Sequence, residues 1–271
     1  MQVREIFVCP PTYVELVYAI NPWMDPSSGF SRELAIEQWE RLIAGYREVG
    51  GPPIHVAEAK EGLTELCFFG DSVFLCEGKA LFGKYRHPER AAEGPYVRDY
   101  LLEHGLVGRD VPEGVAFEGA GETIMWRDKI LFGFGKRSHE VARHFLRQTF
   151  GHDTIDFEME TDHFYHLDTA LLPLSDDLIA YYPPAFGPID TATIESLDCE
   201  KIVVSERDAH AFACNAIVRN GVVFGSEGVH DLWPELRRRG FEVREFDMSE
   251  FQKLGGGIKC LTLQHYETTN A

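Results

Sequence analysis

The chain has 271 residues, of which 44% are hydrophobic, and a formal net charge of −18 at pH 7. It contains no run of about 18 consecutive apolar residues, so we expect no membrane-spanning helix, and the lack of a basic patch argues against a nucleic-acid partner. The negative charge favours solubility and could attract a cationic small molecule to an acidic opening.

The N-terminal third is predicted to begin with a helix and to continue with strands. Residues 33–51 have the apolar spacing of an amphipathic helix that ends at glycines, and residues 53–59 follow as a strand. Residues 62–84 are predicted as a pair of strands that turns at Glu77-Gly78. The second half of 87–105 is predicted as a helix.

The middle of the chain repeats the same kinds of element. Residues 115–120 are predicted as a strand, and residues 123–134 as a hairpin that turns at Arg127-Asp128. A helix is predicted over 138–151 with Ser138 as its N-cap. A strand over 154–160 and a hairpin over 167–182 follow.

The last third continues the pattern without a visible linker. Its predicted elements are a helix near 188–197, a strand at 201–206, a hairpin at 213–224 that turns at Asn220-Gly221, a helix at 230–240, a strand at 241–248 and a final stretch at 255–263. Each unit therefore contains a strand, a hairpin and a helix. We expect one unit to be split between the termini, and the whole chain, 1–271, to form a single domain.

Five polar residues recur at nearly equal intervals. They are Asp71, Glu122, Asp168, Asn215 and Cys260, and subtracting successive numbers gives gaps of 51, 46, 47 and 45 residues. A fixed period of this length is typical of a repeat architecture. If the repeats close into a ring, the five residues meet around one axis and form a site of acids, an amide and a thiol, with His166 beside it.

Cys260 is the candidate nucleophile among six cysteines. Three glycines precede it, which allows close approach to a ligand, and a thiol near an imidazole and backbone N–H groups ionises more easily. A buried cysteine after a flexible turn is an equal alternative for this stretch alone. The cysteines form no CxxC pair and the N-terminus lacks a secretory pattern, so we expect reduced thiols in a cytoplasmic protein.

His166 and Asp168 are two residues apart on a predicted strand, so their side chains would point to the same face. Together they could serve proton transfer and cation binding, although an isolated histidine on a strand is usually structural. His163 and His166 could suggest a metal, but no third ligand follows at a suitable spacing, so no metal site is expected.

Further carboxylates could complete this site. Glu118 lies in FEGAGE, where small neighbours permit close approach of a ligand, and Glu65 and Asp71 flank the apolar run of TELCFFGD. Each could instead be an acid at a bend or a strand end. Several carboxylates, a neutral histidine and a cysteine together suit a guanidinium, because carboxylates pair with its N–H edges and a thiolate could attack its central carbon.

The motifs FEGAGE, FYHLDT and GGGIKC, in this order, resemble those of the guanidino-group-modifying superfamily, which has the pentein fold. The resemblance covers nearly the whole chain and implies an α/β propeller of five blades with pseudo-fivefold symmetry around a central active site. It implies that Cys260 is the nucleophile, His166 the general acid and base, and Glu118 the acid that completes a triad. It also implies a set of substrate-binding residues, namely Asp71, Asp168, Glu65, Arg137 and Arg90.

Within that set, the resemblance places the guanidinium between Asp71 and Asp168 and the α-amino end at Glu65. Arg90 and Arg137 each lie 19 residues after an acid, Asp71 and Glu118 respectively, where the superfamily often has arginines for the substrate carboxylate. Ordinary surface charges are the alternative for both arginines.

The resemblance implies a cofactor-independent hydrolase of C–N bonds that forms a covalent thiouronium and releases ammonia or an amine. L-arginine or a close derivative is the expected substrate, because HLD retains an acid that many dimethylarginine hydrolases lack. CFFGD departs from the deiminase string that ends in Thr-Arg-Asp and from the FTAN string of some arginine dihydrolase-like relatives. Dimethylarginine hydrolysis, amidino transfer and a non-catalytic binding protein therefore stay open as alternatives.

The expected partner is a small guanidino compound, and a homodimer is also compatible with the sequence. Residues 21–31 (NPWMDPSSGFS) have the composition of a loop and could form a mobile lid over the site, with an ordinary surface loop as the alternative.

Overall fold

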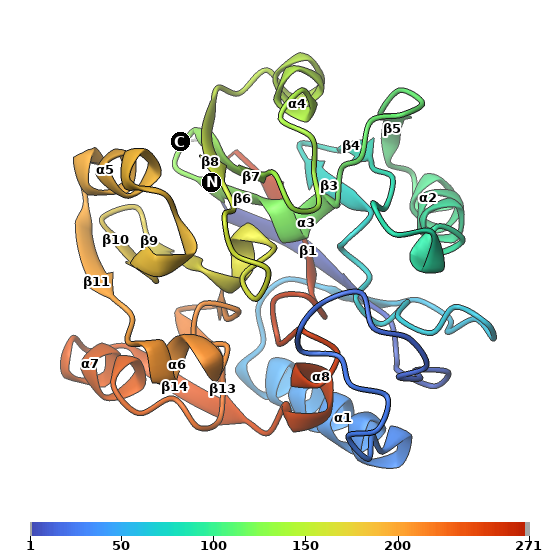
Figure 1. Ribbon diagram of the computed structural model, residues 1–271, viewed down its shortest axis with the longest axis horizontal. Helices are drawn as coiled ribbons and strands as arrows, with labels where there is room; N and C mark the ends of the chain where they lie inside the picture. Colours follow the sequence, from blue (N-terminus) through green and yellow to red (C-terminus); the bar gives the residue numbers. More distant parts are fainter. Residues whose placement is uncertain (1, 269–271) are drawn as a thin grey trace.

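The computed structural model describes residues 2–268, and its elements form five similar units around a central axis. Each unit has an antiparallel hairpin followed by a helix and a third strand, which pairs in parallel with the second hairpin strand. Figure 1 shows helices α1, α2, α4, α5 and α7 on the outside of the ring of strands. The expected five-bladed α/β propeller is thereby confirmed.

Four of the units are continuous in the sequence. The first comprises β3 (Val73–Cys76), β4 (Lys79–Phe82), the 3-10 helix η1 (Pro88–Arg90), α2 (Glu93–Glu103) and β5 (Val107–Asp110). The second comprises α3 (Gly119–Glu122), β6 (Thr123–Trp126), β7 (Lys129–Phe134), α4 (Ala142–Phe150) and β8 (Thr154–Glu158). The third comprises η2 (Leu167–Thr169), β9 (Leu171–Ser175), β10 (Leu178–Tyr181), η3 (Pro183–Ala185), α5 (Pro188–Ser196) and β11 (Glu200–Val203). The fourth comprises α6 (Glu206–His210), β12 (Ile217–Arg219), β13 (Val222–Ser226), α7 (Leu232–Arg238) and β14 (Glu242–Phe246).

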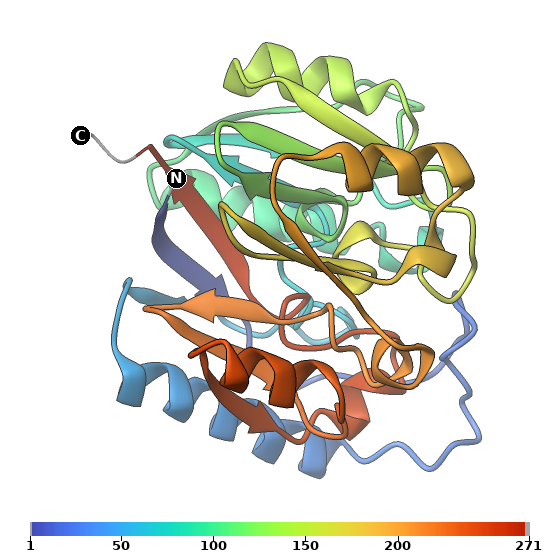
Figure 2. The ribbon, with the colours of Figure 1, turned by 90° about the vertical axis from the view of Figure 1, so that its left-hand side faces the viewer.

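The fifth unit joins the two ends of the chain, as the sequence predicts. Its elements are α8 (Ser249–Gln252), β15 (Leu263–Glu267), β1 (Gln2–Val8), α1 (Arg32–Val49) and β2 (Ile54–Val56). Strand β1 is antiparallel to β15 and parallel to β2, and Figure 2 shows β1 and β15 side by side. The ring therefore closes through contacts between the first and last strands of the chain.

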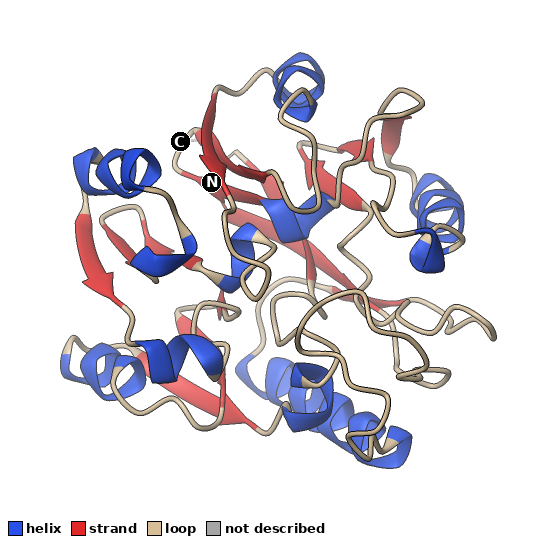
Figure 3. Cartoon of the chain, in the orientation of Figure 1, coloured by secondary structure: helices blue, strands red, loops and turns tan. Residues whose placement is uncertain are grey.

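The first strand of each unit lies at the inner edge of its sheet, and the third strand lies at the outer edge. Three units form separate three-stranded sheets, and a parallel pairing of β15 with β3 merges the other two into one sheet of six strands. The helices lie outside the strands (Figure 3), and apolar side chains of both fill the space between them. No helix within residues 2–268 is long and apolar enough to cross a membrane.

The hairpin turns are where the sequence predicts them. Glu77 and Gly78 have φ values of 52° and 72°, and Asn220 and Gly221 have values of 49° and 80°. Two successive positive φ angles match the right-handed twist of the flanking strands. Arg127 also has a positive φ of 55°, so the turn at Arg127-Asp128 is confirmed.

Several predicted local structures are wrong. Residues 62–72 form turns instead of a strand, and only the end of the predicted strand 115–120 takes part in a β-bridge, between Phe117 and Lys84. Helix α4 begins at Ala142 and Ser138 is not its N-cap; the Ser138 hydroxyl instead accepts a hydrogen bond from the Glu118 N–H at 2.9 Å. Strand β5 was not predicted, because its residues are exposed and lack an apolar alternation.

Candidate active site

Each of the five periodic residues comes just before the first strand of its unit. Because the units form a ring, the N-terminal ends of these five strands lie close together. The Asn215 amide donates hydrogen bonds to Cys260 Sγ at 3.1 Å and to the Asp168 carbonyl at 3.3 Å. The Cys260 thiol lies 3.6 Å from Asp168 Oδ2. All five side chains are buried. The structure thus places a thiol, an amide and several acids at one end of the propeller axis.

Cys260 is held by the segment around it and by Asn215. The backbone N–H groups of Lys259 and Cys260 both donate to Asn215 Oδ1, at 3.1 and 3.3 Å. Gly257 has to be glycine here, because an added Cβ would lie 2.9 Å from Asn215 Oδ1. The three glycines before Cys260 therefore allow close approach of the chain's own residues, which fixes the direction of the thiol.

The protein groups around Cys260 oppose ionisation of its thiol. Burial raises the pKa of the thiol well above its usual value, and the nearby Asp168 and Asp71 raise it further, whereas the Gly257 backbone and the Asn215 amide act in the opposite direction. The expectation that the neighbouring protein groups make the thiol easy to ionise is therefore wrong. A positive charge beside the thiol would reverse this balance.

His166 and Glu118 form a buried ion pair. His166 Nε2 lies 2.8 Å from Glu118 Oε2. Burial alone would lower the pKa of His166, but the contact with Glu118 and the charge of Glu122 raise the pKa to about 9. His166 is therefore an imidazolium at neutral pH, in contrast to the neutral imidazole that the sequence predicts. Gly121 makes room for the ring, since a Cβ there would lie 2.6 Å from Nδ1.

Glu118 is the most completely paired acid of the site. Besides His166, it accepts hydrogen bonds from the Arg86 N–H at 2.9 Å and from Arg137 at 3.2 Å. Burial would raise its pKa, but Arg137 and His166 lower the pKa to about 2. Glu118 is thus ionised at neutral pH and holds the proton on His166.

Three other buried acids have incompletely paired carboxyl groups. Burial raises the pKa of Glu65, Glu122 and Asp168 to about 7 in each case. Each has one carboxyl oxygen without a hydrogen-bond partner among the described residues. Glu122 uses its other oxygen to accept from the Leu167 N–H at 3.2 Å. An ionised carboxylate in such surroundings is stabilised by a nearby cation.

His166 and Asp168 lie on neither a strand nor a shared strand face. Asp168 is in η2, and His166 directly precedes this short helix. His166 therefore contacts Glu118, and Asp168 contacts Cys260. The tight turn at the start of η2 therefore directs two side chains that are only two positions apart toward different residues of the site.

Arg90 lies inside the acid cluster. Its guanidinium donates to Asp71 at 2.6 Å, to Glu93 at 2.7 and 3.0 Å and to the Tyr85 hydroxyl at 3.0 Å. It is buried, so the surface-charge alternative for Arg90 is wrong. In this arrangement Arg90 holds Asp71 in place and keeps most of its own N–H donors occupied.

Arg137 is also buried, and it connects the site to the N-terminal loop. It donates to Glu118 and to the Ile20 carbonyl at 2.8 Å, and its guanidinium lies 4.2 Å from the centre of the Tyr165 ring. Asn21 donates to the Leu254 carbonyl at 3.1 Å. Residues 21–31 form a loop, as predicted, with its first residues beside the site; its movement as a lid stays a prediction.

Sequence reasoning missed several residues around the site. Glu93 pairs with Arg90, Ser138 supports Glu118, and Lys259 is buried next to Cys260. Two of them had a signal: Glu93 is three residues after Arg90, which suits a helical ion pair, and Lys259 is a charge within an apolar segment. Among residues 2–268, no group of three or more His, Cys, Asp or Glu has the geometry to hold a metal ion.

Comparison with known proteins identifies relatives along almost the whole chain. The sequence profile of the family described as N,N dimethylarginine dimethylhydrolase, eukaryotic, matches residues 20–267. The N(G),N(G)-dimethylarginine dimethylaminohydrolase of Mycobacterium tuberculosis is 33% identical over 269 residues, which cover 96% of this chain and 85% of the relative.

A second kind of relative is larger. The bifunctional arginine dihydrolase/ornithine cyclodeaminase ArgZ of Synechocystis is 33% identical over 264 residues, which cover 96% of this chain but only 37% of the relative. The crystal structure of the N-terminal domain of ArgZ, an arginine dihydrolase of cyanobacteria, bound to product, superimposes with a TM-score of 0.92 at 31% identity and covers 98% of this chain and 99% of that domain. The chain therefore spans the part of ArgZ that this domain represents.

Proposed function

The chain belongs to the N,N-dimethylarginine dimethylhydrolase family of the guanidino-group-modifying superfamily, and from this membership we propose that it hydrolyses a C–N bond of L-arginine or a close derivative through a covalent intermediate on Cys260. The observation that carries the proposal is the neighbourhood of the thiol. A paired imidazolium and several buried acids with free oxygens lie around one axis with Cys260.

The buried acids suit a guanidinium better than a metal ion or a neutral ligand. A guanidinium is planar and always charged, and it presents N–H donors along its edges. Among residues 2–268, Asp168 Oδ1 has no partner while Oδ2 contacts Cys260, and Glu65 Oε1 has no partner while Oε2 lies 3.7 Å from Arg90 Nε. Binding of the cation would give these acids a partner and would place a positive charge next to the thiol, which favours the thiolate.

The first stage of the proposed reaction uses His166 as an acid. After the thiol has lost its proton to solvent, the sulfur forms a bond to the guanidinium carbon. The bond from this carbon to the departing nitrogen then breaks, and the nitrogen takes the proton of the imidazolium and leaves as ammonia or an amine. A thiouronium on Cys260 and a neutral His166 are left. The raised pKa of His166 supports this order, because the proton is already in place.

The second stage uses the same residue as a base. Neutral His166 accepts a proton from water while the water oxygen bonds to the thiouronium carbon. The C–S bond then breaks and the new hydroxyl group loses its proton to solvent, which regenerates the thiolate and releases a ureido product. Glu118 stabilises the imidazolium again, since it stays ionised and in contact with Nε2. His166 therefore ends each cycle in the protonation state in which it began.

The choice between arginine and dimethylarginine depends on Asp168. An unsubstituted guanidinium nitrogen would offer N–H donors to the free oxygen of this acid. Two methyl groups on that nitrogen would remove the donors and leave a buried acceptor without a partner, which is costly. This favours arginine, in line with the arginine dihydrolase name of the ArgZ domain. Dimethylarginine hydrolysis is the second candidate, because the matching family carries that name.

A substrate panel tests the proposal. The enzyme would be incubated with arginine, dimethylarginine, agmatine and citrulline, and the products would be identified by mass, with and without glycine as an amine acceptor. We expect citrulline and ammonia from arginine. Ornithine would indicate a second hydrolytic step, and a guanidino product that contains glycine would show amidino transfer instead. No turnover of any compound, together with no labelling of Cys260 by chloroacetamidine, would overturn the proposed chemistry.

A further inference from the structure

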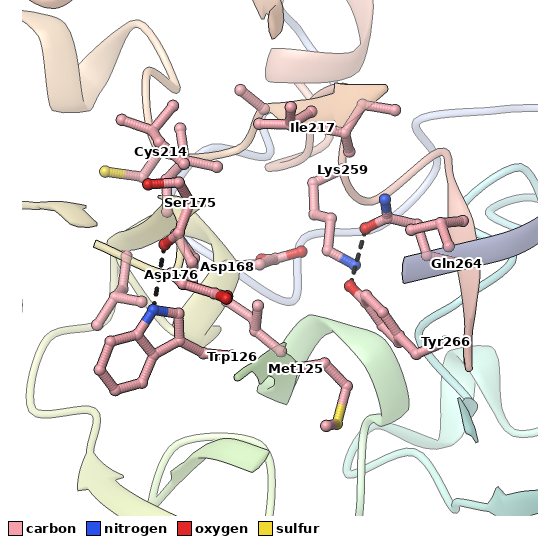
Figure 4. A pocket seen from close by; sticks show the side chains of 18 of the residues that line it. Met125, Trp126, Asp168, Ser175, Asp176, Cys214, Ile217, Lys259, Gln264 and Tyr266 are labelled. Carbon is pink, nitrogen blue, oxygen red and sulfur yellow. Dashed lines mark hydrogen bonds between the residues drawn. The ribbon is translucent and has the colours of Figure 1, made fainter. Parts of the chain in front are cut away.

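A cavity of about 180 Å³ lies along the propeller axis behind the candidate site, between the inner strands of the units. Figure 4 shows Lys259 and Asp168 directed into this space, with Gln264 and Tyr266 of β15 on the side of Lys259. Asp168 therefore borders the axial cavity and also contacts the Cys260 thiol at 3.6 Å. The same carboxyl group faces two separate environments.

Lys259 has a buried side-chain amine that lacks a direct partner among the described residues. The residue is 6% exposed, and its Nζ has no hydrogen-bond partner among the described residues. The pKa of Lys259 is lowered from its usual value, because burial outweighs the opposite effect of the acids Asp168 and Asp71 and of Cys260. An ammonium without an acceptor is costly to bury, so its position requires a compensating interaction with the charges around it.

The backbone determines where Lys259 points. Its N–H donates to the Asn215 carbonyl at 3.2 Å and to Asn215 Oδ1 at 3.1 Å. The same Asn215 side chain donates to Cys260 Sγ. Asn215 therefore fixes both residues, with the thiol beside Asp168 and the lysine side chain in the axial cavity.

We propose that Lys259 is a positioning residue: from the axial cavity its ammonium favours the ionised form of Asp168 and thereby prepares this carboxylate to receive the cationic substrate. The role in substrate binding rests on the proposed function, whereas the effect on Asp168 does not. Lys259 itself contacts neither the substrate nor the reacting atoms in this proposal.

The other charges around Asp168 do not replace this effect. His166 favours the ionised form of Asp168, but its charge is already matched by Glu118 at 2.8 Å. Asp71 opposes ionisation of Asp168. The remaining titratable groups that interact with Asp168 or line its cavity are Cys260, Cys214, Glu122, Tyr266, Arg127 and Asp176. Lys259 differs from these cations, because within residues 2–268 no acid is hydrogen-bonded to its side chain.

The decisive measurement is the titration of Asp168 itself, which needs no activity. Carboxyl signals of the protein labelled with carbon-13 at aspartate would be followed by NMR, with Asp168→Asn to assign the signal. In Lys259→Met we expect the pKa of Asp168 to rise by roughly one unit, because a favourable charge is lost. Lys259→Arg keeps the positive charge, so the pKa of Asp168 in this variant should stay close to its value in the unchanged protein. An unchanged titration in Lys259→Met would overturn the proposal, and Lys259→Gln provides the same test if the methionine variant does not fold.

A kinetic measurement separates this proposal from the proposed function. In Lys259→Met, the acidic limb of the kcat/KM profile for arginine should move to higher pH by the same amount. KM at about pH 6 should then rise several-fold, while kcat at saturating arginine changes little, and Lys259→Arg should reverse the shift. If no variant hydrolyses a guanidino compound but Asp168 still shifts, only the proposed function fails. If arginine is hydrolysed and Asp168 does not shift, only the role of Lys259 fails.

Discussion

The two sides of the candidate site differ in how their charges are matched. On one side, Glu118 contacts both His166 and Arg137, so that a carboxylate and two cations form a closed set. On the other side, Asp168 and Glu122 each keep an oxygen without a hydrogen-bond partner in the part of the chain that the structure describes. The acid of the matched side has its cations in hydrogen-bond contact, whereas the unpartnered oxygens of the open side have no cation in hydrogen-bond contact within residues 2–268.

The pKa values of Glu118 and Asp168 show the same contrast, although both acids are buried. The pKa of Glu118 is lowered to about 2, and that of Asp168 is raised to about 7. Burial raises the pKa of both acids, so the difference comes from their partners. A buried acid with two cations stays ionised, and one with fewer partners holds a proton near neutral pH. The open side is therefore the place where a cationic substrate changes the charge most.

The largest effect should follow from removing the thiol, which lies next to the open side. Cys260→Ser should lower turnover of arginine on the order of 10,000-fold or more, because a hydroxyl is a far weaker nucleophile than a thiolate. Product formation followed by mass measures this loss. The melting temperature should stay close to that of the unchanged protein, and full activity in a folded Cys260→Ser protein would refute the covalent route.

The second largest effect should follow from a substitution of Glu118, the acid of the matched side. Glu118→Gln removes the negative charge that holds the proton on His166, so kcat should fall roughly 100- to 1,000-fold. KM should change much less, because Glu118 is already occupied by protein groups. Steady-state kinetics with arginine give both values, and a rise in KM at constant kcat would contradict this role.

The same variant gives a pH-dependent change in stability. The pKa of His166 is raised to about 9 in the folded protein, so its stabilisation is complete below about pH 6.5 and is lost as the pH rises through about 9. Glu118 has a lowered pKa, so its contribution is present above about pH 4.5 and lost as the pH falls toward about 2. Urea unfolding should therefore show the largest loss for Glu118→Gln between about pH 5 and 6.5 and a smaller loss at about pH 10.

The third effect concerns the open side. In Asp168→Asn a neutral amide replaces the acid, and a charge-assisted contact of about 1.5–3 kcal/mol is lost. KM for arginine should rise roughly 10- to 100-fold, with a smaller change in kcat. Asp176→Asn is the matched control, because Asp176 is an exposed acid at the edge of the axial cavity. Equal effects of the two substitutions on KM would exclude a specific role for Asp168.

The smallest effect is a gain in stability. The pKa of Glu122 is raised from 4.5 to about 7 in the folded protein, so this acid reduces the stability of the fold as the pH rises from about 4.5 to about 7. Glu122→Gln should raise the free energy of unfolding by roughly 1–3 kcal/mol at pH 8 and leave it nearly unchanged at pH 4. Glu227→Gln, at an exposed site, serves as control, and a loss of stability at pH 8 would contradict the assignment.

The repeat and its turns could be predicted because their causes are local. A positive φ at Asn220-Gly221 and an apolar strand on each side suffice to define a hairpin. The split unit followed from counting the repeats, and pairing of β1 with β15 confirms it. By contrast, residues 62–72 were predicted as part of a strand pair, although they form a series of turns in which residues 65–72 are buried beside Arg90. Burial in a polar centre gives the same composition as burial in a sheet.

The sequence by itself determined the fivefold plan, the family and the residues that gather on the axis, because spacing and short motifs carry that information. Only the tertiary structure decided the charge of those residues: a thiol that stays protonated, an imidazolium paired with Glu118, and the lysine next to the thiol in a separate cavity. The reason is physical. A pKa depends on burial and on charges that come from distant parts of the chain, and these distances exist only once the ring is closed.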